Sequence, residues 1–515
     1  MALSSVYEVN LIILEKLDLK SIIAISQLNH ESYKFWTSTV IYREIYIFKN
    51  KKLLNDSQIK TIDICFEFDL FALLKIIVKM NPCRDAITRV MYLASVYNNV
   101  KILDWLMAFF DLKDVDTSKS IDEAAEQGNI KVLEWFKMSG LEFKYSHNAI
   151  DDTSKNGHVM ILDWFKGNCF EFKYSVFAIN NACINGHLGV LDWFRTSGLE
   201  FKYNEFAIDR TSLNGHLQVL NWFLKSDYEI KYTKRAVNWA AEFGHISVLE
   251  WFKAHVEFKY TANAIDNACS NGHITVLEWF RFSGFEFKYT SNAIYYAAGN
   301  GHLRVLKWLK KMGYQFKNVY HAFNAAAENG HVEILEWFKN HFVFEHNNYA
   351  IDAASFNGHV HVLEWFKLSG LKFKYTDTAI DEASLNGHVA VLEWFKKSGY
   401  DFKYSNLAID WAAKKGHIAV LEWFKTSGYE FKYCDAVDNA AKNGHVDVLD
   451  WFKMSGYRFN YSHSAIDAAA KNGHLRVLQW FHDSGYEFRY SKALINAEIE
   501  GHTDIVEWLR RYGYE

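Results

Sequence analysis

Histidine is a residue type that can carry out chemistry, and it recurs in this sequence with a regular spacing. Thirteen of the 22 histidines directly follow a glycine, from His158 to His502. Imidazole binds metal ions and titrates near neutral pH, so such a series suggests a metal site or a pH sensor. Successive copies lie one repeat apart, about 10 Å for packed helices, whereas all ligands of one zinc ion lie about 2 Å from the metal. We therefore expect these histidines to form hydrogen bonds that tie neighbouring turns together.

Aspartate and tryptophan recur with the same spacing. An aspartate ends the triplet Ala-Ile-Asp, and most of the 18 tryptophans stand in the sequence Leu-Glu-Trp-Phe or a close variant of it. Paired carboxylates could carry out acid–base catalysis, and a row of indole rings could stack on bases or sugars. Each copy again lies a full repeat from the next, and no nucleophile recurs beside the aspartates. We therefore assign the tryptophans to the core of a scaffold, and we expect no enzymatic activity, no cofactor and no metal site. The aspartates in question include Asp151, Asp209, Asp266, Asp381 and Asp467.

The period of the sequence predicts the elements that position these residues. The turn glycines from Gly128 to Gly501 recur every 28 or 29 residues, and Asn98 occupies the same place in a degenerate copy upstream. A fixed period of this length indicates a repeat array of about fifteen units.

The unit from Ser405 to Tyr433 is predicted to form two short helices. The hydroxyl of Ser405 can cap the first helix, and the residues Ala408–Ala413 give that helix a narrow apolar face. Gly416 is predicted to end it in a left-handed conformation. Val420–Phe424 form the apolar arc of the second helix. Helices this short cannot bury such faces alone, so neighbouring units must stack.

The run AIDWAAKKGHIAVLEWFKTSG, Ala408–Gly428, resembles the ankyrin repeat, with paired alanines, a Gly-His turn and a second, leucine-containing helix. The resemblance covers residues 95–515. It implies an all-α, ankyrin-type solenoid of helix-turn-helix units that acts as a protein-binding scaffold. The unit is about four residues shorter than the usual 33, so we expect plain loops where ankyrin proteins carry a β-hairpin finger. Short Trp-Phe repeats of this kind are similar to those common in amoebae and giant DNA viruses.

Residues 1–50 do not follow the repeat. The segment Val9–Tyr46 resembles an F-box, although the Leu-Pro that opens a typical F-box is missing. An F-box implies docking on the linker protein of a cullin-type ubiquitin ligase, with the repeats recruiting the substrate. The alternative is a helical cap that closes the end of the stack. We interpret residues 51–94 as a degenerate bridge to the array. The residues that match the F-box include Leu17, Asp18, Leu19, Ile22, Leu28 and Tyr33.

The position after the Ala-Ile-Asp triplet varies from arginine to tryptophan to alanine, unlike a core position. In an ankyrin-like stack the first helix lines the concave side, so large residues here are available to a partner, although an isolated aromatic could equally pack against its own neighbours. The candidate partner-binding residues are Trp239, Tyr296, Trp411, Arg210 and Glu382.

Composition narrows the class of partner. The 57 basic and 61 acidic residues give a net charge of -4, so no global field attracts nucleic acid or an anionic membrane. The six cysteines include no CxxC pair, which favours reduced thiols and a cytoplasmic or nuclear location, or the host cytoplasm for a viral protein. We expect a monomer that binds another protein.

Overall fold

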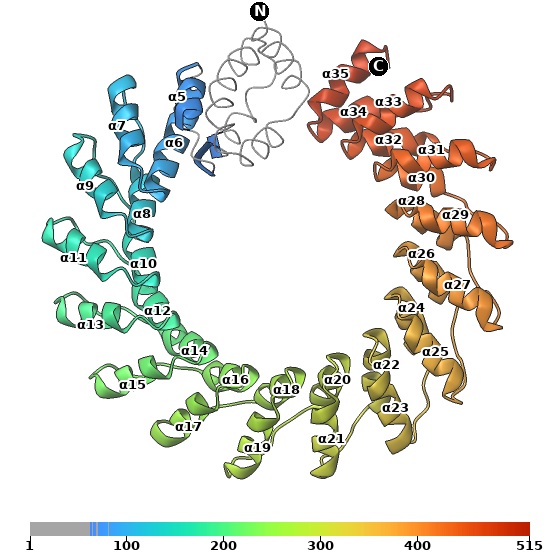
Figure 1. Ribbon diagram of the computed structural model, residues 1–515, viewed down its shortest axis with the longest axis horizontal. Coiled ribbons are helices and arrows are strands. Elements are labelled where there is room, and N and C mark those ends of the chain that lie inside the picture. The colour runs from blue at the N-terminus through green and yellow to red at the C-terminus, as the bar shows by residue number, and fades with distance from the viewer. Residues whose placement is uncertain (1–61, 64, 68–70, 81, 515) are drawn as a thin grey trace, which may run out of the picture. The chain divides into compact units, whose positions relative to one another are not determined.

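The computed structural model describes residues 62–514 except 64, 68–70 and 81 (Figure 1). Regular structure in this part is entirely α-helical, so the predicted all-α repeat fold is confirmed. The chain divides into two compact units, one up to Ala236 and one from Val237. The F-box-like segment lies outside the described residues, so that hypothesis stays a prediction, as do the proposed boundaries at residues 50 and 94.

Helices come in pairs along both units. We call the even-numbered member of each pair the first helix and the odd-numbered member the second helix. The first unit contains α5 (Phe71–Met80), α6 (Arg84–Val96), α7 (Val100–Phe109), α8 (Ser118–Glu126), α9 (Ile130–Met138), α10 (Asn148–Lys155), α11 (Val159–Gly167), α12 (Val176–Ile184), α13 (Leu188–Thr196), α14 (Glu205–Leu213) and α15 (Leu217–Lys225). The division between the units falls within α16 (Lys234–Glu242).

The second unit continues the same alternation. Its helices are α17 (Ile246–His255), α18 (Asn263–Ser270), α19 (Ile274–Phe282), α20 (Ser291–Gly299), α21 (Leu303–Lys311), α22 (Val319–Glu328), α23 (Val332–His341), α24 (Tyr349–Phe356), α25 (Val360–Leu368), α26 (Thr378–Leu385), α27 (Val389–Ser398), α28 (Leu407–Lys415), α29 (Ile418–Ser427), α30 (Ala436–Lys442), α31 (Val446–Ser455), α32 (His463–Lys471), α33 (Leu475–Asp483), α34 (Ala493–Ile499) and α35 (Thr503–Arg511).

Within each unit the first helices lie side by side along one edge and the second helices along the other (Figure 1). Neighbouring first helices contact each other far more extensively than neighbouring second helices do. Alanine explains this difference, because a methyl side chain lets two helix backbones approach closely. Ala412 and Ala413 of α28 are completely buried. The equivalent residues of α18, Ala268 and Cys269, are completely buried as well.

The second helix supplies the large core side chains. In α29, Val420, Leu421 and Phe424 are completely buried, whereas Trp423 is only half-buried. The prediction that the recurrent tryptophans belong to the core is therefore wrong for most of them. The physical reason is helical geometry: residue 423 lies beside Phe424 at the edge of the apolar arc, and its indole N–H needs a polar partner. The recurrent tryptophans that are buried are Trp105, Trp251, Trp308 and Trp337.

Each half-buried tryptophan links two repeats. The indole N–H of Trp423 donates to Oε2 of Glu393 in the preceding second helix at 2.9 Å. The same ring stacks on Phe402 of the preceding connector, with 5.4 Å between ring centroids. The connectors contain no strand, which confirms the expected plain loops. Tyr404 ties one connector to the next by donating its hydroxyl to the carbonyl of Glu430. The tryptophans are thus scaffold residues at the rim of the core.

The turn glycines adopt the predicted left-handed conformation. Gly416 has φ 78° and Asn98, in the degenerate copy, has φ 53°. A second constraint was not visible in the sequence: the ring of His445, one repeat further on, lies against Gly416, and a Cβ there would stand 2.8 Å from Nδ1. Gly428, at the end of α29, has φ 87° and no atom within 4 Å of a Cβ position.

This contrast gives a matched pair of substitutions. Gly428→Ala should lower the free energy of unfolding by about 1–2 kcal/mol, the penalty for an L-residue in the left-handed region. Gly416→Ala should lower it by clearly more, because the His445 ring must also move. Urea unfolding of both variants checks this. Equal losses of unfolding free energy in the two variants would show that the His445 ring moves away from a Cβ at position 416 at little cost.

Candidate functional site

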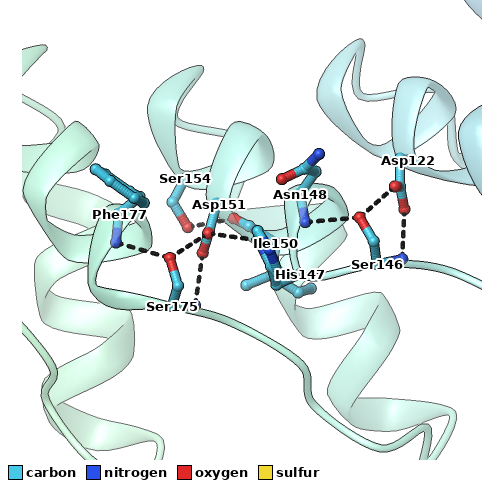
Figure 2. Close-up of polar contacts among 9 residues, drawn as sticks. All are labelled: Asp122, Ser146, His147, Asn148, Ile150, Asp151, Ser154, Ser175 and Phe177. Atoms are coloured by element: carbon cyan, nitrogen blue, oxygen red, sulfur yellow. Dashed lines mark hydrogen bonds and ion pairs between the residues drawn. The ribbon is translucent and has the colours of Figure 1, made fainter.

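The recurrent aspartate of the first helix is a buried link between repeats. Asp381 in α26 accepts hydrogen bonds from both the backbone N–H and the hydroxyl of Ser405, two residues before the start of α28. The Ser405 oxygen in turn accepts from the N–H of Leu407 at 3.1 Å, which is the predicted capping role. We call this arrangement the clip. Figure 2 shows two successive clips, from Asp122 to Ser146 and from Asp151 to Ser175.

The clip recurs along both units, with asparagine replacing aspartate in places. Burial raises the pKa of the Asp381 carboxyl above its ordinary value, and the two hydrogen bonds from Ser405 partly oppose that shift. The recurrent aspartates are therefore structural hydrogen-bond acceptors, a role that sequence reasoning did not assign to them. The clip residues are Asp122, Asp151, Asn180, Asp209, Asn238, Asp266, Asn324, Asp352, Asp381, Asp410, Asp438 and Asp467.

The Asn-Gly-His turns form a second set of links. The Nε2 atom of His331 lies 3.0 Å from the carbonyl oxygen of Gly299 in the preceding repeat. The side chain of Asn300 donates to the carbonyl of Ser270 at 2.8 Å. The prediction that the histidines tie turns together is confirmed, and the asparagine before the glycine is a tie that sequence reasoning missed. No cluster of residues able to hold a metal ion occurs in the described part of the chain.

The histidine ladder makes stability depend on pH. Burial lowers the pKa of His273, His359, His417 and His474 below the ordinary value of 6.5, and neighbouring ladder histidines lower it further. The unfolded chain then binds more protons than the folded chain just below pH 6.5, so stability falls as the pH drops. Burial raises the pKa of six of the clip aspartates, which therefore act in the opposite sense, but nearer pH 4. These are Asp122, Asp209, Asp266, Asp381, Asp410 and Asp438.

We therefore expect the free energy of unfolding to decrease between about pH 7 and pH 5.5. His417→Gln should reduce this slope, because it removes one proton-binding difference between the folded and unfolded chain. Thermal melting at a series of pH values measures the effect. A melting temperature that is constant or rises towards pH 5.5 would contradict it.

The five candidate partner-binding residues lie on the exposed side of the first helices. Tyr296 is 42% exposed; Glu382, Trp411 and Trp239 are half-exposed and Arg210 is exposed. Glu382 and Trp411 lie on α26 and α28, which pack against each other. Tyr296 lies on α20 of the same unit, with α22 and α24 between it and α26. Arg210 belongs to the first unit, so it is described apart from the others.

The clip is interrupted at one position between Asp122 and Asp467. Tyr295 stands where the first helices from α8 to α32 otherwise carry Asp or Asn. Asn318, the residue before α22, adopts a left-handed conformation with φ 56° and makes no capping hydrogen bond with its side chain. A hollow of about 300 Å³ opens here, lined by Ser291, Asn292, Tyr295, Tyr296, Asn318 and His321. Sequence reasoning missed this site, although the signal is present as Ala-Ile-Tyr-Tyr in place of Ala-Ile-Asp.

A comparison with protein families places this same region in a known class. Residues 294–338 match the family model described as ankyrin repeats in many copies. This match covers 45 residues of the 515-residue chain. The ankyrin match includes the irregular repeat with Tyr295 and Tyr296, and the regular repeats around it keep the same helix pair and turn.

Comparisons with solved structures and with curated proteins do not assign a family. Among solved structures, the chain is similar to the pentatricopeptide repeat protein PPR10 from maize, with 11% identity, a TM-score of 0.29 and coverage of 97% of this chain and 81% of that chain. The search of curated proteins gives no match. Among the residues that the structure describes, no helix is long and apolar enough to cross a membrane.

Proposed function

We propose that the chain is a scaffold that binds a partner protein through the exposed face of its first helices. Ankyrin repeats are typical protein-interaction modules, and stacked repeats present an extended, concave surface on one side. The proposal rests on the observation that the residues that link neighbouring repeats differ from those that remain accessible. The recurrent polar residues are engaged in clips, turns and indole bonds, whereas large side chains such as Tyr296 and Trp411 remain accessible on this face.

Trp411→Ala tests the proposal against a matched residue of the same type. We expect this change to weaken partner binding by about 2 kcal/mol, as loss of an aromatic anchor does, and to leave the melting temperature nearly unchanged. Trp423→Ala should do the reverse, because Trp423 links two second helices. The partner is identified first by placing a photo-crosslinking residue at 411 or 296, with Lys425 on the outer side of α29 as the control position. Crosslinks from position 425 but not from 296 or 411 would move the binding surface to the second helices.

The ubiquitin-ligase adaptor is the alternative function, and it depends on residues 1–50. The Leu17-Asp18-Leu19 step and the apolar run around it support this alternative. Co-purification of the ligase's linker protein with the full chain, but not with a chain lacking residues 1–50, would establish it. We also propose a cytoplasmic or nuclear location, supported by the scattered cysteines without a CxxC pair.

A further inference from the structure

Five successive first helices of the second unit contain no lysine or arginine. These helices are α18, α20, α22, α24 and α26. Basic residues return immediately afterwards, as Lys414 and Lys415 at the end of α28. The helices from α20 to α26 instead carry exposed tyrosines and half-buried glutamates. We call Tyr295, Tyr296, Glu328, Tyr349 and Glu382 together the acidic–aromatic face.

The acidic–aromatic face is one continuous set of neighbours across four first helices. The hydroxyl of Tyr349 in α24 donates to Oε2 of Glu328 in α22 at 3.1 Å. Burial raises the pKa of Tyr349, and the nearby charges of Glu328 and Glu382 raise it further. Tyr349 lies on α24, which packs against both α22 and α26, the helices that carry these two glutamates. Tyr295 also interacts with Tyr349 and meets Tyr296 edge to face, with 5.3 Å between ring centroids.

The two glutamates of this face have no cationic partner in the described part of the chain. Glu382 is half-buried beside the clip carboxylates of Asp352 and Asp381, and burial together with these two charges raises its pKa. The carboxylate of Glu328 accepts a hydrogen bond from the neutral hydroxyl of Tyr349. A half-buried carboxylate without a cation is unfavourable in the free protein, and a cation from outside would relieve that.

The shape of the face leaves room for side chains of a partner. Ala325 and Ala353, in α22 and α24, occupy the position that Tyr296 has in α20 and Glu382 has in α26, and Gly299 ends α20 without a side chain. Tyr295 and Tyr296 form one wall of the hollow of about 300 Å³ at the interrupted clip. Both tyrosine rings are accessible, at 38% and 42%.

We infer that the acidic–aromatic face binds an arginine- or lysine-rich segment of the partner protein, an inference that rests on the proposed scaffold function. A guanidinium group forms paired hydrogen bonds with a carboxylate and also stacks on an aromatic ring. The face offers both kinds of group within a stretch that has no competing lysine or arginine on its first helices. An ammonium group over a tyrosine ring gains the same electrostatic attraction.

Peptide binding to the full chain tests this inference. The probe is a fluorescein-labelled oligoarginine peptide, compared by anisotropy with an oligocitrulline peptide of the same length, whose side chains are neutral and nearly isosteric. We expect the arginine peptide alone to bind. The double variant Glu328→Gln/Glu382→Gln should weaken its binding by at least about tenfold, and Tyr295→Ala/Tyr296→Ala should also weaken it.

A matched double variant controls for net charge. Glu286 and Glu430 lie on connectors of the same unit, and their side chains are 77% and 76% exposed. Glu286→Gln/Glu430→Gln removes the same two charges and should change the affinity less than about twofold. Thermal melting of every variant separates lost binding from lost folding.

Three results would overturn the inference. These are equal weakening by the connector variant, equal binding of the citrulline peptide, and no binding of either peptide. If crosslinks from positions 296 and 411 still capture a partner in those cases, the scaffold proposal stands and only the basic-segment inference fails. If the arginine peptide binds as expected but no partner crosslinks at these positions, the scaffold proposal fails instead.

Discussion

Phe424→Ala should lower the free energy of unfolding by about 3–5 kcal/mol. Phe424 is completely buried between the helices of its own repeat and the connector aromatics Phe402 and Tyr404. Truncation removes its ring from an apolar site and leaves a cavity, because the surrounding helices cannot fully close around alanine. Urea unfolding followed by circular dichroism measures the loss.

Trp423→Ala, one residue earlier, is the comparison that makes this prediction informative. Trp423 is half-buried and loses a stack on Phe402 and a bond to Glu393, so we expect a smaller loss of about 1–2 kcal/mol. Both residues lie in the same helix and are large aromatics, so differences in helix propensity stay small. A loss at Trp423 equal to that at Phe424 would show that the indole belongs to the core after all.

Asp381→Ala is expected to have the second large effect, a loss of about 2–4 kcal/mol. The substitution leaves the partly buried N–H and hydroxyl of Ser405 without their shared acceptor. It also frees the residue that caps α28, so the first turn of that helix should fray. Thermal melting detects the loss, and amide exchange at Leu407 and Ala408 localises it.

A natural variant of the clip provides the control for this prediction. In the first unit, Asn180 and Asn204 form the clip with a side-chain bond of 2.7 Å from Nδ2 to Oδ1. The double substitution Asp381→Asn/Ser405→Asn should therefore restore much of the stability that Asp381→Ala loses. Failure of the double variant to recover any stability would mean that the aspartate charge, and not the hydrogen-bonding pattern, stabilises the junction.

The fold follows from the sequence because its determinants are local. The repeat period, the left-handed glycines such as Gly416 and the cap serine Ser405 each act within one unit, so a single unit predicts the helix pair. The small first-helix residues likewise predict close stacking. These features were read correctly because no distant contact was needed to interpret them.

The links between repeats could not be predicted in the same way. The partner of Asp381 is Ser405, 24 residues further along, and only the stacked geometry shows that the two side chains meet. The recurrent tryptophan, such as Trp423, was misassigned because it lies at the edge of the apolar face of its helix. Helical periodicity alone does not distinguish a residue at that edge from one at the centre of the face. The interrupted clip at Tyr295 was legible as a departure from the triplet, but its hollow depends on Asn318 and His321 from the next repeat.

The clips have a mechanical consequence for the array. A force applied along the stack is transmitted across each regular junction by the hydrogen bonds of a clip. In one of them, the backbone N–H of Thr376 donates to Oδ1 of Asp352 at 3.0 Å. The junction after Tyr295 lacks these hydrogen bonds, so α20 and α22 are held there by helix packing, which is as extensive as at any other junction between first helices. A partner that spans this junction would add a polar link between two repeats that otherwise adhere through apolar contact.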